Sequence, residues 1–120
     1  NKQAVAQGKP SLFDQAFIEE QTIGFSDMLA ELDRTEWAEI HRYTGLSPDH
    51  LEALAKLYIQ SERPIFCWGM GITQHRHGTA NVHLLANLVL CRGLLGKPGA
   101  GLAPIRGHSN VQGDRTVGIN

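Results

Sequence analysis

The stretch PIFCWGMG at residues 64–71 decides the fold of this chain. Its first five residues form a short continuous apolar run, which is typical of a strand buried in a parallel sheet, and the glycines that follow predict a tight turn. Residues 79–92 are apolar on most of a helical circumference, so they predict a helix that is buried on more than one side. Strand, glycine-rich turn and helix together form the half-unit of α/β sheets that bind a ligand outside the carboxyl ends of their strands.

Helices are also expected upstream of this unit. The sequence predicts them over residues 14–20, 25–33, 35–43 and 48–61. The last of these begins with Ser47-Pro48-Asp49, in which the serine caps free N–H groups, the proline presets φ and the aspartate complements the helix dipole. Trp37, Ile40 and Tyr43 share one face of the third helix, and this spacing predicts that they pack into a core.

Downstream of residue 92 the helical pattern dissolves into repeated glycines. Residues 93–113 predict a long structured loop, and long loops inside compact domains are commonly functional. A buried helix in a chain of 120 residues also implies a neighbouring domain or a partner subunit that covers it. We therefore expect an α/β fragment of a Rossmann-like layered domain, with a short parallel sheet flanked by helices.

Charge and glycine are distributed unevenly along the chain. Residues 1–60 carry ten acids and five bases, a net −5, whereas residues 61–120 carry two acids and six bases, a net +4. Ten of the thirteen glycines also lie in residues 61–120, where a backbone without side chains approaches a ligand closely. This composition favours an anionic ligand in the second half, with chance clustering as the alternative. No carboxylate lies between Glu62 and Asp114, and the basic residues in that stretch are Arg63, Arg76, Arg92, Lys97 and Arg106.

Composition disfavours several classes of protein. The net charge of −1 argues against nucleic-acid binding. Cys67 and Cys91 lie far apart in apolar runs, so neither a CxxC redox pair nor a zinc site is expected. No apolar run approaches the roughly 18 residues that a membrane span needs. The chain begins at Asn1 rather than Met and shows no signal-peptide pattern, so we expect a cytoplasmic piece of a longer protein.

Segments that contain glycine or histidine are candidates for a binding site. Gly69–Gln74 lies where a dinucleotide fingerprint would, but Gln74 replaces its third glycine, so a plain turn is an equal alternative. Residues 93–98 fail as a phosphate-binding P-loop because the glycine spacing is too short and no Ser or Thr follows the lysine. His75 and His77 have no carboxylate or thiolate nearby, which disfavours a metal site and favours contact with an anion at a helix N-terminus.

The segment with the densest set of functional groups is Arg106-Gly107-His108-Ser109-Asn110. It places a permanent guanidinium, a titratable ring, a hydroxyl and an amide in five consecutive residues. An arginine in this setting clamps a phosphate or a small carboxylate through paired hydrogen bonds. The alternative is a surface turn with a solvated arginine.

Three segments of the chain resemble the molybdopterin oxidoreductase family in order and spacing. They are residues 68–74 (WGMGITQ), 96–101 (GKPGAG) and 106–113 (RGHSNVQG). Upstream, residues 14–25 resemble that family's D-x-x-F-I…T-x-G-F segment, and residues 44–47 resemble its lead into the next helix. The resemblance runs from about residue 14 to the end of the chain. Within the family it is to formate dehydrogenase catalytic subunits and to a sister clade of formate-dehydrogenase-like alpha subunits.

This resemblance implies a bis(molybdopterin guanine dinucleotide) cofactor on molybdenum or tungsten, whose pyrophosphates would suit an acid-free, glycine-rich surface. By position, the residues implied to bind the cofactor are Gly69, Met70, Gly71, Gln74, Gly107 and Asn110. The resemblance also implies that Arg106 orients an anionic substrate beside the metal. His108, expected to shape the pocket or relay a proton, stands where formate dehydrogenases carry Gln. This departure points to the sister clade and leaves formate or another small anion as the substrate.

The resemblance also places the chain inside a larger catalytic subunit. Residues 1–107 would form part of a molybdopterin-binding α/β domain, and residues 108–120 a glycine-rich active-site segment that leads into the next domain. No residue of this chain is expected to ligate the metal, and an iron–sulfur cluster or electron-transfer subunits would belong to the rest of the parent protein. The alternative is a non-catalytic, degenerate cofactor domain that serves assembly through the apolar face of the 79–92 helix.

Overall fold

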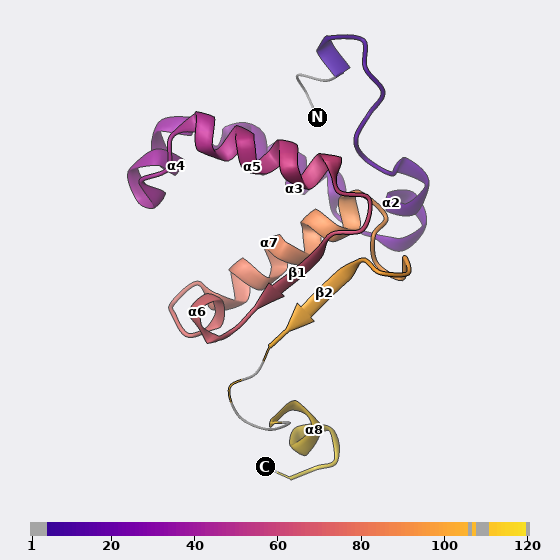
Figure 1. Cartoon of the computed structure of the whole chain (residues 1–120), viewed down its shortest axis with the longest axis vertical. Helices are drawn as coiled ribbons and strands as arrows, with labels where there is room; N and C mark the ends of the chain where they lie inside the picture. The colour runs from indigo at the N-terminus through magenta and orange to yellow at the C-terminus, as the bar shows by residue number, and fades with distance from the viewer. Residues whose placement is uncertain (1–4, 106, 108–110, 120) are drawn as a thin grey trace.

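A computed structural model describes residues 5–105, 107 and 111–119 of the chain (Figure 1). Its elements in chain order are α2 (Gln15–Gln21), α3 (Phe25–Arg34), α4 (Trp37–Thr44), α5 (Pro48–Gln60), β1 (Ile65–Trp68), α6 (Met70–Thr73), α7 (Gly78–Cys91), β2 (Gly101–Pro104) and α8 (Val111–Thr116). A short parallel sheet with helices around it confirms the predicted α/β class. No helix in the described part of the chain is long and apolar enough to cross a membrane.

The sheet consists of β1 and β2, which pair in parallel. The register runs from Ile65 opposite Gly101 to Trp68 opposite Pro104. The connection from β1 to β2 passes through α6 and α7, and Figure 1 shows α7 lying along the two strands. The prediction of one long loop over residues 93–113 is wrong at α8, which begins at Val111. It is also wrong at β2, because a four-residue strand bounded by glycine and proline has little local signal. Its pairing with β1 is what makes it a strand.

The burial expected for β1 is only partly observed. Phe66 and Trp68 are half-buried, and the Phe66 ring packs edge-on against Tyr58 of α5 with 5.5 Å between centroids. Ile65, by contrast, is 57% exposed, and Cys67 is exposed as well. In this chain, therefore, the strand is covered on one face, where two-sided burial was predicted.

The start of α2 is tied to the end of α7. Asp14 caps α2 by accepting a hydrogen bond from Phe17 N at 3.0 Å, and Asp14 N donates to Cys91 O at 2.9 Å. Gly93 then turns the chain with a φ of +57°, and a Cβ there would meet the Asp14 carboxylate at 2.5 Å. The left-handed conformation favours glycine at this position, and a Cβ would also displace the capping carboxylate of Asp14. The fully buried side chains Val89 and Leu94 lie on either side of this junction.

The helix α4 projects from the rest of the structure in Figure 1. Trp37 is 59% exposed and Tyr43 is 71% exposed, so the prediction that they pack into a core is wrong for this chain. Ile40 on the same face is half-buried. The Arg42 guanidinium lies 4.3 Å from the centroid of the exposed Tyr43 ring. The helical spacing predicts this helix correctly, but spacing alone does not show which element covers its apolar face.

Arg92 joins the end of α5 to the end of α7. Its guanidinium donates hydrogen bonds to three carbonyl oxygens at the end of α5, those of Tyr58 (2.7 Å), Ile59 (3.3 Å) and Ser61 (3.1 Å). It also stacks on the Tyr58 ring at 4.7 Å. The Tyr58 hydroxyl donates in turn to Leu88 O of α7 at 2.5 Å. Burial raises the pKa of Tyr58, although the nearby Arg92 charge acts in the opposite direction.

We predict that Arg92→Met destabilises the junction of α5 and α7. The substitution keeps an unbranched apolar stem but removes three charge-assisted hydrogen bonds to the last carbonyls of α5, for a loss of about 2 kcal/mol in local opening free energy. Amides in the last turn of α5 should then exchange about thirty-fold faster in the full-length protein, measured by hydrogen–deuterium exchange.

The matched control is Arg42→Met. Arg42 also stacks on a tyrosine and donates to its hydroxyl at 2.6 Å, but this pair is exposed and joins neighbours in the sequence. Its removal should cost less than about 1 kcal/mol. If amide exchange became faster by the same factor in both variants, Arg92 would have no special role at the junction of α5 and α7.

Candidate functional site

The carboxyl ends of β1 and β2 lie at the same edge of the sheet because the strands are parallel. The candidate cofactor segment Gly69–Gln74 begins directly after β1, and the segment that contains Gly107 follows β2. This edge is where α/β sheets bind their ligands. The structure thus brings together two candidate segments that are far apart in the sequence. We call this region, formed by residues 69–74, 105 and 107, the strand-end site.

The first segment forms a short helix where a turn was predicted. Gly69 precedes α6 in an extended conformation, and the helix is closed by hydrogen bonds from Ile72 N to Gly69 O (3.2 Å) and from Gln74 N to Met70 O (2.8 Å). A Cβ on Gly71 would meet no atom within 4 Å. The backbone at Gly71 is therefore open to the approach of a ligand.

A hydrogen bond joins the two segments where they leave the sheet, and two glycines mark how close they come. Ile105 N donates to Trp68 O at 2.7 Å, which continues the pairing beyond the last residues of the sheet. A Cβ on Gly69 would lie 3.4 Å from Ile105 O, and a Cβ on Gly107 would lie 3.1 Å from the Met70 methyl carbon Cε. Three of the predicted cofactor-binding residues, Gly69, Met70 and Gly107, consequently lie together. Arg106, His108 and Asn110 lie outside the described residues.

The two histidines between α6 and α7 take part in the structure of the turn. His75 Nδ1 accepts a hydrogen bond from His77 N at 3.2 Å, and its Nε2 lies 2.7 Å from the Asn81 side-chain amide nitrogen. The same amide donates to Ile72 O of α6 at 3.4 Å. Among the described residues, no group of three His, Cys, Asp or Glu side chains could hold a metal ion. His75 therefore has a structural role, and its contact with an anion stays a prediction.

Close packing at Gly78 fixes the position of α7 relative to α6. A Cβ on Gly78 would collide with the carbonyl of Thr73, the last residue of α6, so only glycine allows this approach. The N-terminus of α7 is thereby held next to the strand-end site.

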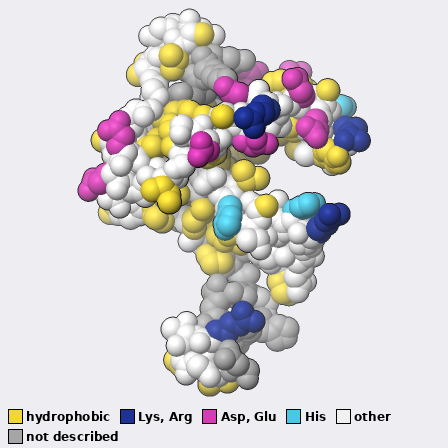
Figure 2. Space-filling view, turned by 180° about the vertical axis from the view of Figure 1, so that it is seen from behind, with side chains coloured by type: hydrophobic (Ala, Val, Ile, Leu, Met, Phe, Trp, Pro, Cys, Tyr) yellow, Lys and Arg dark blue, Asp and Glu magenta, His cyan; other side chains and the backbone are white. Residues whose placement is uncertain are grey.

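Charge separates along the molecule as the sequence predicts. Figure 2 shows the acidic side chains gathered over the upper part of the molecule, where α2 to α5 lie, and none on the visible lower part. Of the basic residues in the acid-free stretch, Arg92 is committed to the carbonyls of α5. Arg92 therefore stabilises the fold. Fewer basic side chains are then left to bind the anion than the composition of the sequence indicates.

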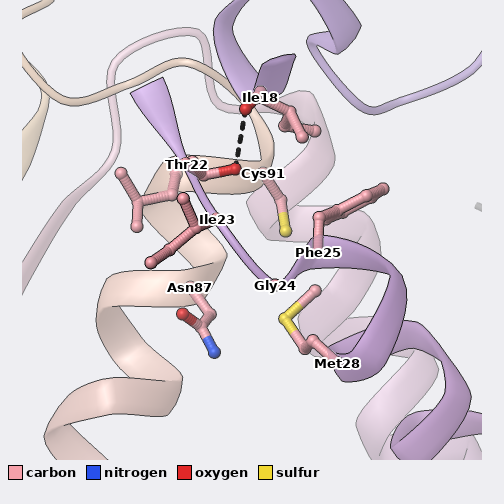
Figure 3. Close-up of a pocket in the computed structure, with 9 residues that line it drawn as sticks. Ile18, Thr22, Ile23, Gly24, Phe25, Met28, Asn87 and Cys91 are labelled. Carbon is pink, nitrogen blue, oxygen red and sulfur yellow. Dashed lines mark hydrogen bonds between the residues drawn. The ribbon is translucent and has the colours of Figure 1, made fainter. Parts of the chain in front are cut away.

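Two cavities lie away from this site, near the opposite end of α7. One has a volume of about 110 Å³ and is formed by α7, α3 and the connection between α2 and α3 (Figure 3). The other, of about 340 Å³, lies between α3, α5 and α7 and is lined mainly by apolar side chains. Cys91 borders both, and burial raises the pKa of its thiol. The sequence did not predict these cavities. Apolar residues at helical spacing are equally typical of a fully packed helix face and of one that borders a cavity.

Comparisons with known proteins agree with the family that the sequence resembles. The sequence profile of the family described as molybdopterin oxidoreductase matches residues 15–118. The chain is 55% identical to Protein YdeP of Escherichia coli over 116 residues, which are 97% of this chain and 15% of that protein.

Two further relatives are described as oxidoreductases. The chain is 40% identical over 109 residues to an uncharacterized oxidoreductase of Mycobacterium tuberculosis, which covers 91% of this chain and 14% of that protein. It is 35% identical over 108 residues to Formate dehydrogenase H of Escherichia coli, or 90% of this chain and 15% of that protein. The chain thus spans about 15% of the length of the curated relatives that it matches. With the profile matched over nearly its whole length, the chain belongs to the molybdopterin oxidoreductase family.

Proposed function

We propose that this chain forms part of the catalytic subunit of a formate-dehydrogenase-like oxidoreductase. The observation that carries the proposal is the meeting of Gly69, Met70 and Gly107 at the carboxyl edge of a parallel sheet, in a chain of this family. The cofactor would be bis(molybdopterin guanine dinucleotide) carrying molybdenum or tungsten. When bound, it would supply a metal that exchanges two electrons with a small substrate.

The described residues fit such a cofactor. Gly71 leaves its backbone open on a surface where a Cβ would meet nothing, so a large ligand can approach closely. No carboxylate lies between residues 62 and 114, so no acidic side chain of that stretch repels a pyrophosphate. The residues proposed to hold the cofactor are Gly69, Met70, Gly71, Gln74, Gly107 and Asn110.

The substrate is proposed to be formate or another small anion. Arg106 carries a permanent charge in a planar fork, which suits a carboxylate, and it is bonded directly to Gly107 of the strand-end site. Oxidation of formate releases carbon dioxide, two electrons and a proton, so a titratable group beside the substrate is useful. His108 is proposed to take that proton or to shape the pocket.

The wider organisation follows from the same proposal. Residues 1–107 would belong to a cofactor-binding α/β domain, and residues 108–120 would lead through the active site into the next domain. Electron-transfer subunits, and an iron–sulfur cluster where one exists, would belong to the parent enzyme, which we propose to be cytoplasmic.

One observation favours a second candidate function. Leu84 and Leu88 of α7 are 55% and 43% exposed, and both line the 340 Å³ cavity. An apolar helix face of this kind would serve a non-catalytic, degenerate cofactor domain whose role is assembly. Metal content separates the two candidates.

We predict that the full-length protein, expressed in cells that make the cofactor, contains about one molybdenum or tungsten atom per molecule. Elemental analysis and guanine release after acid treatment measure the metal and the dinucleotide form. Gln74→Ala should lower both together, because this variant removes a proposed cofactor contact. Protein that is folded but free of both metals and of guanine would favour the assembly function.

We predict that Arg106→Ala lowers kcat/KM for the anionic substrate by about a hundredfold or more, since a charge-assisted clamp on an anion contributes about 3 kcal/mol. Metal content should stay close to that of the unmodified protein. Steady-state kinetics with formate and other small anions provide the measurement. Arg34→Ala is the control, because Arg34 forms only an exposed ion pair with Glu31. Turnover by Arg106→Ala at the unmodified rate with every anion would remove the assigned role.

We predict that His108→Gln changes the pH dependence of kcat. If the imidazole relays a proton, its replacement by a group that does not titrate removes one limb of the pH–rate profile. His50→Gln, on the exposed start of α5, serves as the control. An identical profile in His108→Gln and the unmodified enzyme would exclude the relay and leave His108 with the pocket-shaping role.

A further inference from the structure

We propose that Asn81 is a positioning residue: its side chain holds the turn between α6 and α7 in place, and with it Gln74, which is assigned above to cofactor binding. The inference rests on the proposed function, because Gln74 matters here as a contact of the cofactor. It gives a role to a half-buried residue of α7 that has no part in the site described so far. That role requires contacts that form only when α7 packs against the end of α6.

The side-chain amide of Asn81 reaches two residues that flank Gln74. Its nitrogen donates to Ile72 O at 3.4 Å and lies 2.7 Å from Nε2 of the His75 ring. Because α6 ends at Thr73, the carbonyl of Ile72 has no partner within the helix and needs a donor from elsewhere. One side chain of α7 thus contacts the chain on both sides of Gln74.

The contact with His75 explains why an amide stands at position 81. A neutral imidazole carries one hydrogen, so one ring nitrogen donates while the other accepts. If Nδ1 accepts from His77 N, over a distance of 3.2 Å, Nε2 donates and the amide oxygen of Asn81 is its acceptor. If the hydrogen is on Nδ1, Nε2 accepts from the amide nitrogen, which also reaches Ile72 O. An amide pairs with either tautomer, because it contains both a donor and an acceptor.

The backbone brings Asn81 within reach of these partners. Glycine at position 78 lets α7 begin against Thr73, where a Cβ would collide with the carbonyl. In the turn itself, Gly78 N donates to His75 O at 3.0 Å, and Asn81 N donates to His77 O at 2.9 Å. Asn81 therefore lies in the first turn of a regular helix. Its side chain is short and half-buried, so the amide has little freedom to move.

Gln74 lies where the chain leaves α6. Its N–H donates to Met70 O at 2.8 Å, and its φ of −88° and ψ of 56° are no longer helical. The direction of its exposed side chain is therefore set by the chain on either side, which Asn81 contacts. Without the amide of Asn81 the turn is free to move, and ordering Gln74 against a ligand then costs conformational entropy.

The test is a double-mutant cycle in the full-length protein, made in cells that supply the cofactor, with Asn81→Leu, Gln74→Ala and the double variant. Metal and guanine that remain per protein molecule after dialysis measure cofactor retention. Asn81→Leu, of similar size, should lower retention about threefold or more. The double variant should retain as much as Gln74→Ala alone, because Asn81 acts through Gln74. Asn81→Gln keeps the donor and the acceptor and should restore most of the retention.

A second readout does not depend on the cofactor. In hydrogen–deuterium exchange, the amides of residues 74–78 should exchange about tenfold faster in Asn81→Leu, as expected for the loss of a neutral hydrogen bond. His75→Phe keeps a ring but removes both nitrogens, so it should have the same effect, and combining it with Asn81→Leu should add little. Asn87→Leu is the matched control. Asn87 lies on the same helix, lines the two cavities near its other end and should leave exchange in the turn unchanged.

The outcomes separate this inference from the proposed function. If the protein binds the cofactor but the losses in Asn81→Leu and Gln74→Ala multiply in the double variant, Asn81 does not act through Gln74 and the positioning role is wrong. Unchanged exchange in the turn of Asn81→Leu would also overturn it. If Asn81→Leu does not fold, His75→Phe, at an exposed position, replaces it in the cycle with Gln74→Ala. Full-length protein without molybdenum, tungsten or guanine would instead refute the proposed function, and the cofactor role of Gln74 with it.

Discussion

The parallel pairing of β1 with β2 is the constraint on which the candidate site depends. Because the strands run in the same direction, the residues after Trp68 and those after Pro104 leave the sheet at one edge. The hydrogen bond from Ile105 to Trp68 extends this pairing by one step, and the glycines beyond it approach α6 without side chains in the way. In an antiparallel pair, Gly107 would leave at the other edge, next to α2 and away from Met70.

The long helix α7 makes this pairing possible, because it carries the chain back from the site to the start of β2. Different contacts fix the two ends of this helix. At the N-terminus, Gly78 lets the backbone approach Thr73, whereas at the C-terminus Arg92 and Asp14 tie α7 to α5 and α2. The basic residues of the acid-free stretch are consequently divided between tasks. Arg92 holds the fold together, and the positive charge left for a ligand is smaller than composition indicates.

Sequence reasoning succeeded where the cause of a structure is local. The predicted cap at Ser47 marks the start of α5, and the motif at residues 69–74 marks the edge of the sheet. It failed where the cause is a distant partner, as for β2, which exists through its pairing with β1. It also failed for Trp37, which the described part of the chain leaves 59% exposed. The structure brings the cofactor segment close to Gly107, which the sequence did not predict. The cofactor contacts of these residues stay predictions, as do the roles of Arg106, His108 and Asn110.

The glycines show why composition overstates the extent of a binding surface. Gly93 is needed for a left-handed turn beside Asp14, and Gly78 for the approach of two helices, so neither is there for a ligand. Gly71 is open to the exterior, and Gly107 leaves room for the Met70 methyl group. The same residue type thus meets four different requirements within one stretch of chain. A count of glycines in the sequence adds them together, and only the positions of their neighbours separate a binding surface from a hinge or a packing contact.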